Sequence, residues 1–400
     1  MQIADSMSLL GEETAFEVLA KAKALEAQGI DMIHMEIGEP DFDTPEFIKD
    51  AAKKALDDGY THYTPSKGLP EVREVFADYI METRRVPVTR SEVVITPGAK
   101  PIIFFGLIAT INPGDEVIYP DPGFPIYKSV IEFLGAKAVP LPLREECAFR
   151  FRHEDLWRLA NERTKMIIIN SPENPTGGVL TEHDLVVISE VAKEYDCWVM
   201  ADEVYSTILY DGLKHQSIIA LPGMQERTIL VEGHSKTYAM TGWRLGYGVM
   251  QEGLASHITR LMNNSCSCTA AFAQIAGRAA YEGPTDCLDE MRSEFEARRD
   301  LIVAGLNSID NVTCLKPKGA FYVFPNFKEF GWTSKDIETY LLQKANVATL
   351  AGTSFGKFGE GYIRFSYACS QENIQRGIQR LDKALANLPK LPYRQPVYAD

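Results

Sequence analysis

The sequence lacks both a long apolar run and an excess of basic residues. Its longest apolar stretch, residues 101–111, is shorter than the roughly 20 residues that a membrane-spanning helix needs. The net charge is −14, because 55 acidic residues outnumber 41 basic ones. This balance disfavours a nucleic acid or an anionic membrane as a partner, although it leaves room for a local basic pocket that binds a small anion.

Paired cysteines are also missing from the sequence. The seven cysteines are an odd number and form no Cys-x-x-Cys pair, and the Cys-Ser-Cys at 266–268 has no second Cys or His pair nearby to complete a metal site. The first residues lack the basic region and apolar core of a signal peptide. We therefore expect a cytoplasmic protein with free thiols and no metal.

Short β-branched runs alternate with helical patterns through the middle of the chain. This alternation is typical of βαβ units, which form a parallel sheet, and the runs are apolar enough to be buried on both faces. A length of 400 residues predicts one large domain and a smaller one. The predicted strands are residues 92–96, 115–120, 165–170, 197–202 and 228–233.

The sequence pattern changes near residue 290. A charged helical stretch is followed by the alternating segments 320–325 and 362–368 and by an amphipathic helix near 371–387, which together predict an α+β domain. A first helix at about 13–28 has no strand partner nearby in sequence, so we expect it to pack beside that domain. The predicted division is an N-terminal segment 1–47, a large cofactor-binding domain 48–290 and a small domain 291–400.

Reactive groups follow four strands of the predicted sheet. Because ligands of open parallel sheets bind beyond the carboxyl ends of the strands, we expect these groups to lie at one edge. A helix that begins with small residues leaves its first N–H groups free for an anion. Each group alone is explained by an ordinary turn, helix cap or surface charge, but their joint position predicts a binding site. In chain order, they are Gly98, Ala99 and Lys100, then Asn174, then Asp202 with Tyr205, and finally Lys236.

A cofactor with a phosphate, a basic ring nitrogen, a phenolate and an aldehyde would use all of these groups. Pyridoxal phosphate is such a cofactor. Asp202 would keep the ring nitrogen protonated, while Tyr205 and Asn174 would hydrogen-bond the phenolate oxygen. Lys236 would form the Schiff base, which requires a neutral amine and hence desolvation or neighbouring positive charge. Arg244 would bind the phosphate through charge-assisted hydrogen bonds.

Eight motifs occur in a specific order along nearly the whole chain. They are IGEPDFDTP (37–45), YTPSKGLPEVR (63–73), TPGAKPI (96–102), NPGDEVIYPDPGFPIY (112–127), SPENPTGG (171–178), ADEVY (201–205), SKTYAMTGWRLGY (235–247) and YIRFSYA (362–368). In this order the chain resembles the class I aminotransferases of fold-type I pyridoxal-phosphate enzymes, the group that contains aspartate aminotransferase. The resemblance implies an α/β fold: a large domain with a mostly parallel central sheet sandwiched by helices, and a smaller α+β domain.

The resemblance also implies how the phosphate is held. Arg244 and the N–H groups of residues 98–100 would bind it, and Tyr63 would reach it from the neighbouring subunit of a homodimer. The family often carries a phosphate-binding serine three residues before the Schiff-base lysine, but this chain has Gly233 there. Ser235 is the remaining candidate hydroxyl for this contact.

Further roles concern the cofactor ring and the substrate. The resemblance implies that Phe124 stacks on the cofactor ring and that Arg364 clamps the α-carboxylate of the substrate, with Asn174 close by. Gly38 belongs to a segment that closes over the substrate. Alternation in 362–368 places Arg364 on the face opposite its two neighbours. The catalytic residues are then Lys236, Asp202 and Tyr205.

These residues predict a ping-pong transamination between an L-amino acid and a 2-oxo acid. Lys236 would act as general base and acid on the α-proton. A carbon–sulfur β-lyase or a synthase of the same fold would use the same cofactor groups. A serine hydrolase through Ser354 in Gly-x-Ser-x-Gly is a remote alternative, because such an enzyme needs a histidine after the serine and the last histidine is His257.

The substrate side chain has a weaker signal. We find no second arginine that would bind a dicarboxylate. The segment GEETAF (11–16) lies near the substrate according to the resemblance, and its acidic residues give the hypothesis that aspartate and glutamate are disfavoured.

Overall fold

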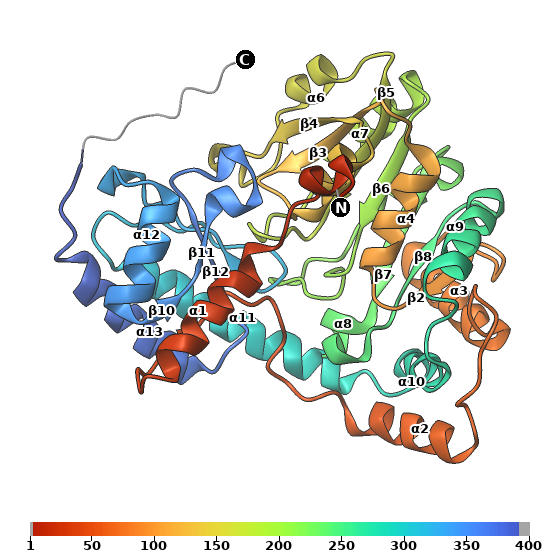
Figure 1. Ribbon diagram of the computed structural model, residues 1–400, viewed down its shortest axis with the longest axis horizontal. Helices are drawn as coiled ribbons and strands as arrows, with labels where there is room; N and C mark the ends of the chain where they lie inside the picture. Colours follow the sequence, from red (N-terminus) through yellow and green to blue (C-terminus); the bar gives the residue numbers. More distant parts are fainter. Residues whose placement is uncertain (1–2, 392–400) are drawn as a thin grey trace.

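A seven-stranded sheet forms the centre of the larger lobe (Figure 1). The computed structural model describes residues 3–391. Residues 1–2 of the predicted N-terminal segment and residues 392–400 of the predicted small domain lie outside this range. All neighbouring strands are parallel except β8, which is antiparallel to both of its neighbours. The strand order is β2 (Val93–Thr96), β8 (Gly246–Val249), β7 (Thr228–Gly233), β6 (Trp198–Asp202), β5 (Thr164–Asn170), β3 (Glu116–Asp121) and β4 (Lys137–Pro142).

Helices cover both faces of this sheet, as its apolar strands require. Alternate strand residues enter two separate cores: Val93 and Ile95 belong to one, and Val94 belongs to the other. The first core is shared with α2 (Glu46–Asp57), α3 (Pro70–Arg84), α6 (His153–Leu159), α7 (Glu182–Glu194) and α10 (Ala271–Glu282). The second is shared with α4 (Lys100–Thr110), α5 (Ile126–Phe133) and α9 (Glu252–Ser265).

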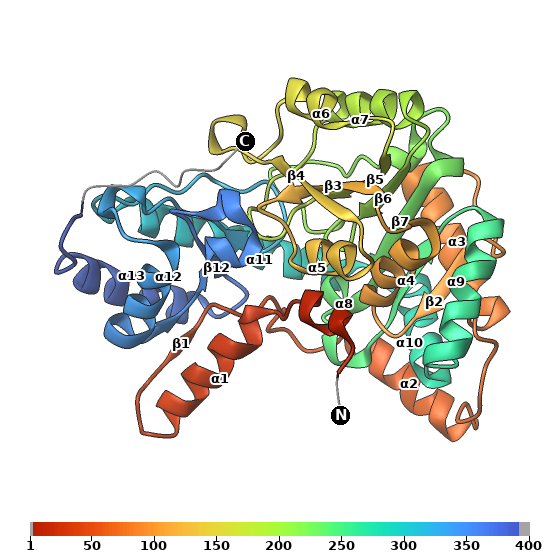
Figure 2. The same ribbon diagram turned by 45° about the horizontal axis from the view of Figure 1, so that its top comes forward.

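A smaller α+β lobe lies beside the first (Figure 2). It holds an antiparallel sheet with the strand order β11 (Leu350–Ala351), β12 (Ile363–Ser366) and β9 (Tyr322–Val323), and a parallel pair of β1 (Ile33–His34) with β10 (Val347–Ala348). Its helices are α11 (Asp286–Asn307), α12 (Ser334–Tyr340) and α13 (Gln371–Leu385). The expected domain boundary at residue 290 falls inside α11.

The N-terminal helix α1 (Thr14–Glu26) packs on the smaller lobe. Its buried residues Val18 and Ala22 share a core with Ala348 of β10 and Leu350 of β11. This helix therefore lies beside the strands of the smaller lobe. No helix within residues 3–391 is both long enough and apolar enough to cross a bilayer.

Candidate active site

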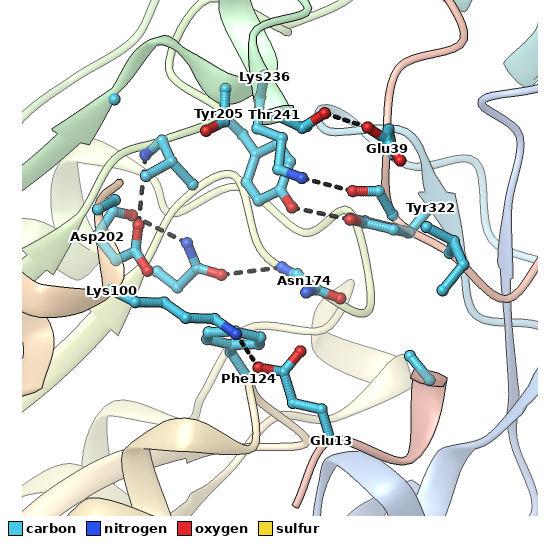
Figure 3. A pocket seen from close by; sticks show the side chains of 18 of the residues that line it. Glu13, Glu39, Lys100, Phe124, Asn174, Asp202, Tyr205, Lys236, Thr241 and Tyr322 are labelled. Atoms are coloured by element: carbon cyan, nitrogen blue, oxygen red, sulfur yellow. Dashed lines mark hydrogen bonds and ion pairs between the residues drawn. The ribbon is translucent and has the colours of Figure 1, made fainter. Parts of the chain in front are cut away.

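A cavity of about 520 Å³ lies where the carboxyl ends of the parallel strands meet the smaller lobe (Figure 3). The last residues of β5, β6 and β7, which are Asn170, Asp202 and Gly233, all reach its wall. The expected clustering of strand ends is therefore present in the fold. The predicted site residues that line the cavity are Gly38, Ala99, Lys100, Phe124, Asn174, Asp202, Tyr205, Ser235, Lys236, Arg244 and Arg364.

Two other predicted site residues stand apart from this lining in the described chain. Gly98 precedes Ala99 in a left-handed conformation with φ of +90°, and a Cβ there would lie 2.3 Å from Nη2 of Arg244. Glycine is thus required for the guanidinium to approach the start of α4. The Tyr63 side chain is 91% exposed on the surface. Ser354, the remote hydrolase candidate, lies in the turn Gly352–Phe355 of the smaller lobe.

Lys236 projects into the cavity from α8 (His234–Thr237), the single turn of helix directly after β7. Its Nζ donates a hydrogen bond to the carbonyl oxygen of Gly38. Loss of hydration lowers the pKa of this amine to about 8; Glu39 opposes the shift, and the cations Arg364, Arg244 and Lys100 add to it. A substantial neutral fraction is therefore available near pH 7 for attack on an aldehyde.

Asp202 lies at the end of β6 and is buried. It accepts hydrogen bonds from the Tyr127 hydroxyl at 2.7 Å and from the Val204 N–H at 3.4 Å. Burial raises the pKa of this carboxyl to about 6. A carboxyl that lacks a cationic partner in a buried site would gain most from a protonated ring nitrogen beside it.

Neighbouring polar residues orient Asn174. The side chain of Asn170 accepts a hydrogen bond from the Asn174 N–H at 2.9 Å and donates one to the carbonyl oxygen of Asp202 at 2.9 Å. The amide oxygen of Asn174 accepts a hydrogen bond from Nη1 of Arg364 at 3.0 Å. This chain of contacts fixes the amide between the end of β6 and the smaller lobe.

Arg364 on β12 brings a buried guanidinium to the cavity. Its Nη2 donates to the carbonyl oxygen of Glu36, and its guanidinium lies 4.6 Å from the ring centroid of Tyr322. Burial lowers the pKa of Arg364. Its Nε is buried and has no hydrogen-bond partner among the described residues, so a donor remains for a carboxylate that enters the cavity.

Arg244 and the small residues around it form the other end of the site. Arg244 follows the turn Thr241–Trp243 in a left-handed conformation, and its Nη1 donates to the Thr241 carbonyl oxygen at 2.8 Å. At Gly246 a Cβ would lie 2.4 Å from the backbone nitrogen of Ala99, so β8 packs directly against the start of α4. At Gly233 the nearest atoms to an added Cβ are 3.5 Å away, so a side chain would fit there.

The residues present fit pyridoxal phosphate in kind and in arrangement. A guanidinium and a helix start, which suit a phosphate, lie around Gly98. Asp202 supplies a carboxylate, Phe124 an aromatic wall and Lys236 an amine of lowered pKa. The unpartnered Nε of Arg364 marks a second anion position, as an amino-acid carboxylate requires.

Several residues that shape this site were not predicted from the sequence. The hydroxyl of Tyr322 on β9 lies 2.8 Å from that of Tyr205, and both face the cavity (Figure 3). Tyr127 and Asn170 were missed as well. Tyr322 occurs in the alternating segment 320–325, which predicted a strand without indicating which side chain faces a ligand.

Comparisons with known proteins agree with this site. The family described as aminotransferase class I and II matches residues 30–381. An aspartate aminotransferase of Pyrococcus abyssi is 43% identical over 89% of this chain and 92% of its own length. An aromatic-amino-acid aminotransferase of Thermococcus litoralis is 41% identical over 90% and 93%. The crystal structure of the aspartate aminotransferase from Rhizobium meliloti has a TM-score of 0.93, with 34% identity over 97% of this chain and all of the other.

Fold, site and matches together define an enzyme of the pyridoxal-phosphate-dependent transaminase type. The chain belongs to the class I and II aminotransferase family. The predictions of the family, of the α/β fold and of an amino-acid aminotransferase are therefore confirmed. The individual residue roles stay predictions and are proposed below.

Proposed function

We propose that the protein transfers the α-amino group of an L-amino acid to a 2-oxo acid in a ping-pong cycle, with Lys236 as the catalytic amine. The observation that carries this proposal is the position of one desolvated lysine, with its pKa lowered to about 8, in the same cavity as Asp202 and Arg364. When bound, pyridoxal phosphate supplies an electron sink that makes the α-proton of an amino acid acidic.

Different residues of the cavity hold the ring and the phosphate of the cofactor in this proposal. Asp202 binds the ring nitrogen, and Tyr205 with Asn174 binds the phenolate oxygen. Phe124 packs against the ring. Residues 98–100 offer backbone N–H groups to the phosphate, which Arg244 also binds; Ser235, which lines the cavity, offers a hydroxyl to the same group.

Two residues of this chain act on the substrate, and a third positions one of them. Arg364 binds the α-carboxylate, using its unpartnered Nε. The neutral amine of Lys236 would take the α-proton as general base and, as general acid, deliver it to the exocyclic carbon of the cofactor. Gly38 lies over Lys236 and holds its amine; a Cβ at Gly38 would lie 1.9 Å from the hydroxyl of Tyr322, so this approach requires glycine.

A homodimer completes the site in this proposal. Tyr63, which is 91% exposed in the single chain, would be buried against the phosphate end of the partner subunit's cavity. Sedimentation should show a dimer, and Tyr63→Phe should weaken the binding of pyridoxal phosphate to that dimer. A monomer that binds the cofactor with full affinity would contradict the proposed role of Tyr63. The seven cysteines are all free thiols, which supports a reducing, cytoplasmic location.

The direct test follows both half-reactions. Purified protein with pyridoxal phosphate should show a visible absorbance band that an amino-acid donor removes and a 2-oxo acid restores. Lys236→Ala should bind the cofactor and lose the conversion, whereas Lys53→Ala, at an exposed lysine, should behave as wild type. A β-lyase would instead release ammonia from the donor, and failure of a 2-oxo acid to restore the band would favour that alternative.

The relatives' names include both aspartate and aromatic amino acids. The preferred donor therefore depends on the residues that line the cavity of this chain.

A further inference from the structure

An ion pair crosses the cavity between the two lobes. The carboxylate of Glu13, directly before α1, contacts the Nζ of Lys100, the first residue of α4 (Figure 3). Both side chains line the cavity. Because α1 packs on the smaller lobe and α4 on the sheet, the pair connects the two lobes. Since both of its side chains line the cavity, the pair lies in the space that a substrate would enter.

The pair matters because of what the other cations do. Among the described residues that line the cavity, four are cationic: Lys100, Lys236, Arg244 and Arg364. The proposed function uses Lys236 for the cofactor aldehyde, Arg244 for the phosphate and Arg364 for the α-carboxylate. Lys100 is then the cation left to bind a second substrate carboxylate. Its positive charge is already paired with the carboxylate of Glu13.

A second carboxylate would also meet acidic groups. Besides Glu13, the cavity wall holds Glu39, whose carboxylate accepts a hydrogen bond from the Thr241 hydroxyl. A substrate carboxylate near Lys100 would displace Glu13 or lie beside it, and two carboxylates that share one cation in a partly buried site repel each other.

The remaining wall near Glu13 is apolar. Ala15, Phe16, Ile37 and Ile103 line the same cavity, and Phe16 is 62% exposed, unusually open for a large apolar side chain. Such a surface gains free energy when it covers an uncharged apolar group.

We propose that the Glu13–Lys100 pair closes the position for a distal carboxylate, so that the preferred donor carries an uncharged apolar side chain rather than that of aspartate or glutamate. This inference rests on the proposed function and names its substrate class. Because donor and acceptor occupy the site in turn, the same preference applies to the 2-oxo acid: pyruvate is favoured over 2-oxoglutarate.

Unreactive analogues test the inference by binding rather than by turnover. Maleate carries two carboxylates, and 3-phenylpropionate carries one carboxylate and an apolar group. The dissociation constant of each for the holoenzyme is measured by titration calorimetry. Wild type should bind 3-phenylpropionate more tightly, and Glu13→Gln should shift the affinity ratio about 10-fold toward maleate, the size of one charge-assisted hydrogen bond.

Two further variants identify the cause. Glu12→Gln removes the same charge from an exposed neighbouring position and should leave the affinity ratio unchanged. Adding Lys100→Ala to Glu13→Gln should abolish the gain for maleate, because the freed amine is what binds it.

The outcomes separate this inference from the proposed function. A holoenzyme that transaminates but binds maleate as tightly as 3-phenylpropionate, or whose ratio is unchanged in Glu13→Gln, overturns the inference alone. A protein that forms no cofactor band and transfers no amino group overturns both.

Discussion

Asp202 and Glu203 are adjacent buried carboxylates whose pKa values move in opposite directions. Asp202 faces the cavity, where burial raises its pKa to about 6. Glu203 faces the opposite side; burial alone would raise its pKa too, but His215, Arg84 and hydrogen bonds lower it to about 2. The difference is the partner: a buried charge with a fixed counter-charge stays ionised, and one without it gains from binding a cation.

The same contrast extends to the two regions around these residues. Behind the cavity, Arg84 donates to Glu203 at 2.8 Å and to Glu232 at 2.7 Å, and Ser206 donates to Glu232 at 3.0 Å. This buried ion cluster connects the end of β6 to the end of β7. Asp202 is the last residue of β6, and Lys236 lies in the helix that follows β7. Burial raises the pKa of Glu232 to about 7, against the opposing effect of Arg84, so Glu203 is the carboxylate of this cluster that stays ionised. The contacts of Arg84 thus hold in place the two strand ends whose side chains face the cavity.

Removing the amine of Lys236, the proposed catalytic group, should give the largest effect. Lys236→Ala should lower turnover at least about 10⁴-fold, because the general base and the covalent attachment point are lost together. The free energy of unfolding, measured in urea, should not fall, because burial of the Lys236 amine costs hydration energy that the variant no longer loses. Single-turnover conversion of donor measures the first effect, and turnover within tenfold of wild type would refute the assigned role.

Breaking the ion cluster should instead destabilise the fold. Arg84→Met leaves Glu232 buried without its cation and removes one of the two cationic partners of Glu203, so the free energy of unfolding should fall by about 3–5 kcal/mol. Urea denaturation measures this loss, with Arg158→Met, at an exposed arginine, as control. A loss below about 1 kcal/mol would mean that the cluster does not hold the strand ends together.

Weakening the substrate contact should have a smaller and more selective effect. Arg364→Lys keeps a positive charge but loses the planar fork, so the KM for amino acids should rise about 100-fold. The dissociation constant for pyridoxal phosphate, measured by fluorescence, should change little because Arg364 is assigned to the substrate. Equal losses in both constants would place Arg364 at the cofactor.

The pH dependence of cofactor capture should show the smallest effect. Only the neutral amine reacts, and the pKa of Lys236 is lowered to about 8. The rate at which apoenzyme binds pyridoxal phosphate covalently should therefore rise about 10-fold per pH unit below pH 8 and level off above it. Stopped-flow absorbance records this profile; a rate that climbs steadily to pH 10 would indicate an ordinary lysine.

Much of the cavity side of this comparison was predictable from sequence. Lys236 and Asp202 follow apolar strands directly, and parallel strands bring their carboxyl ends together without further information. The alternation of residues along the strand also predicted that Arg364 lies on the face opposite its two neighbours. In these cases local pattern and sheet topology suffice.

The supporting contacts were not predictable, because they join distant segments. Arg84 is 119 residues from Glu203, and Tyr322 is 117 residues from Tyr205; no local pattern encodes such pairs. The acidic residues of 11–16 were expected near the substrate, but the pairing of Glu13 with Lys100 depends on how the lobes meet. The role proposed for Tyr63 depends on a second chain, which sequence patterns within one chain do not place.

Chemical trapping tests the central assignment most directly. The holoenzyme is reduced with borohydride, digested and mapped by mass spectrometry. We predict a pyridoxyl group on Lys236 and on no other lysine, including Lys100 in the same cavity. A label on another lysine, or an unlabelled protein, would contradict the assignment.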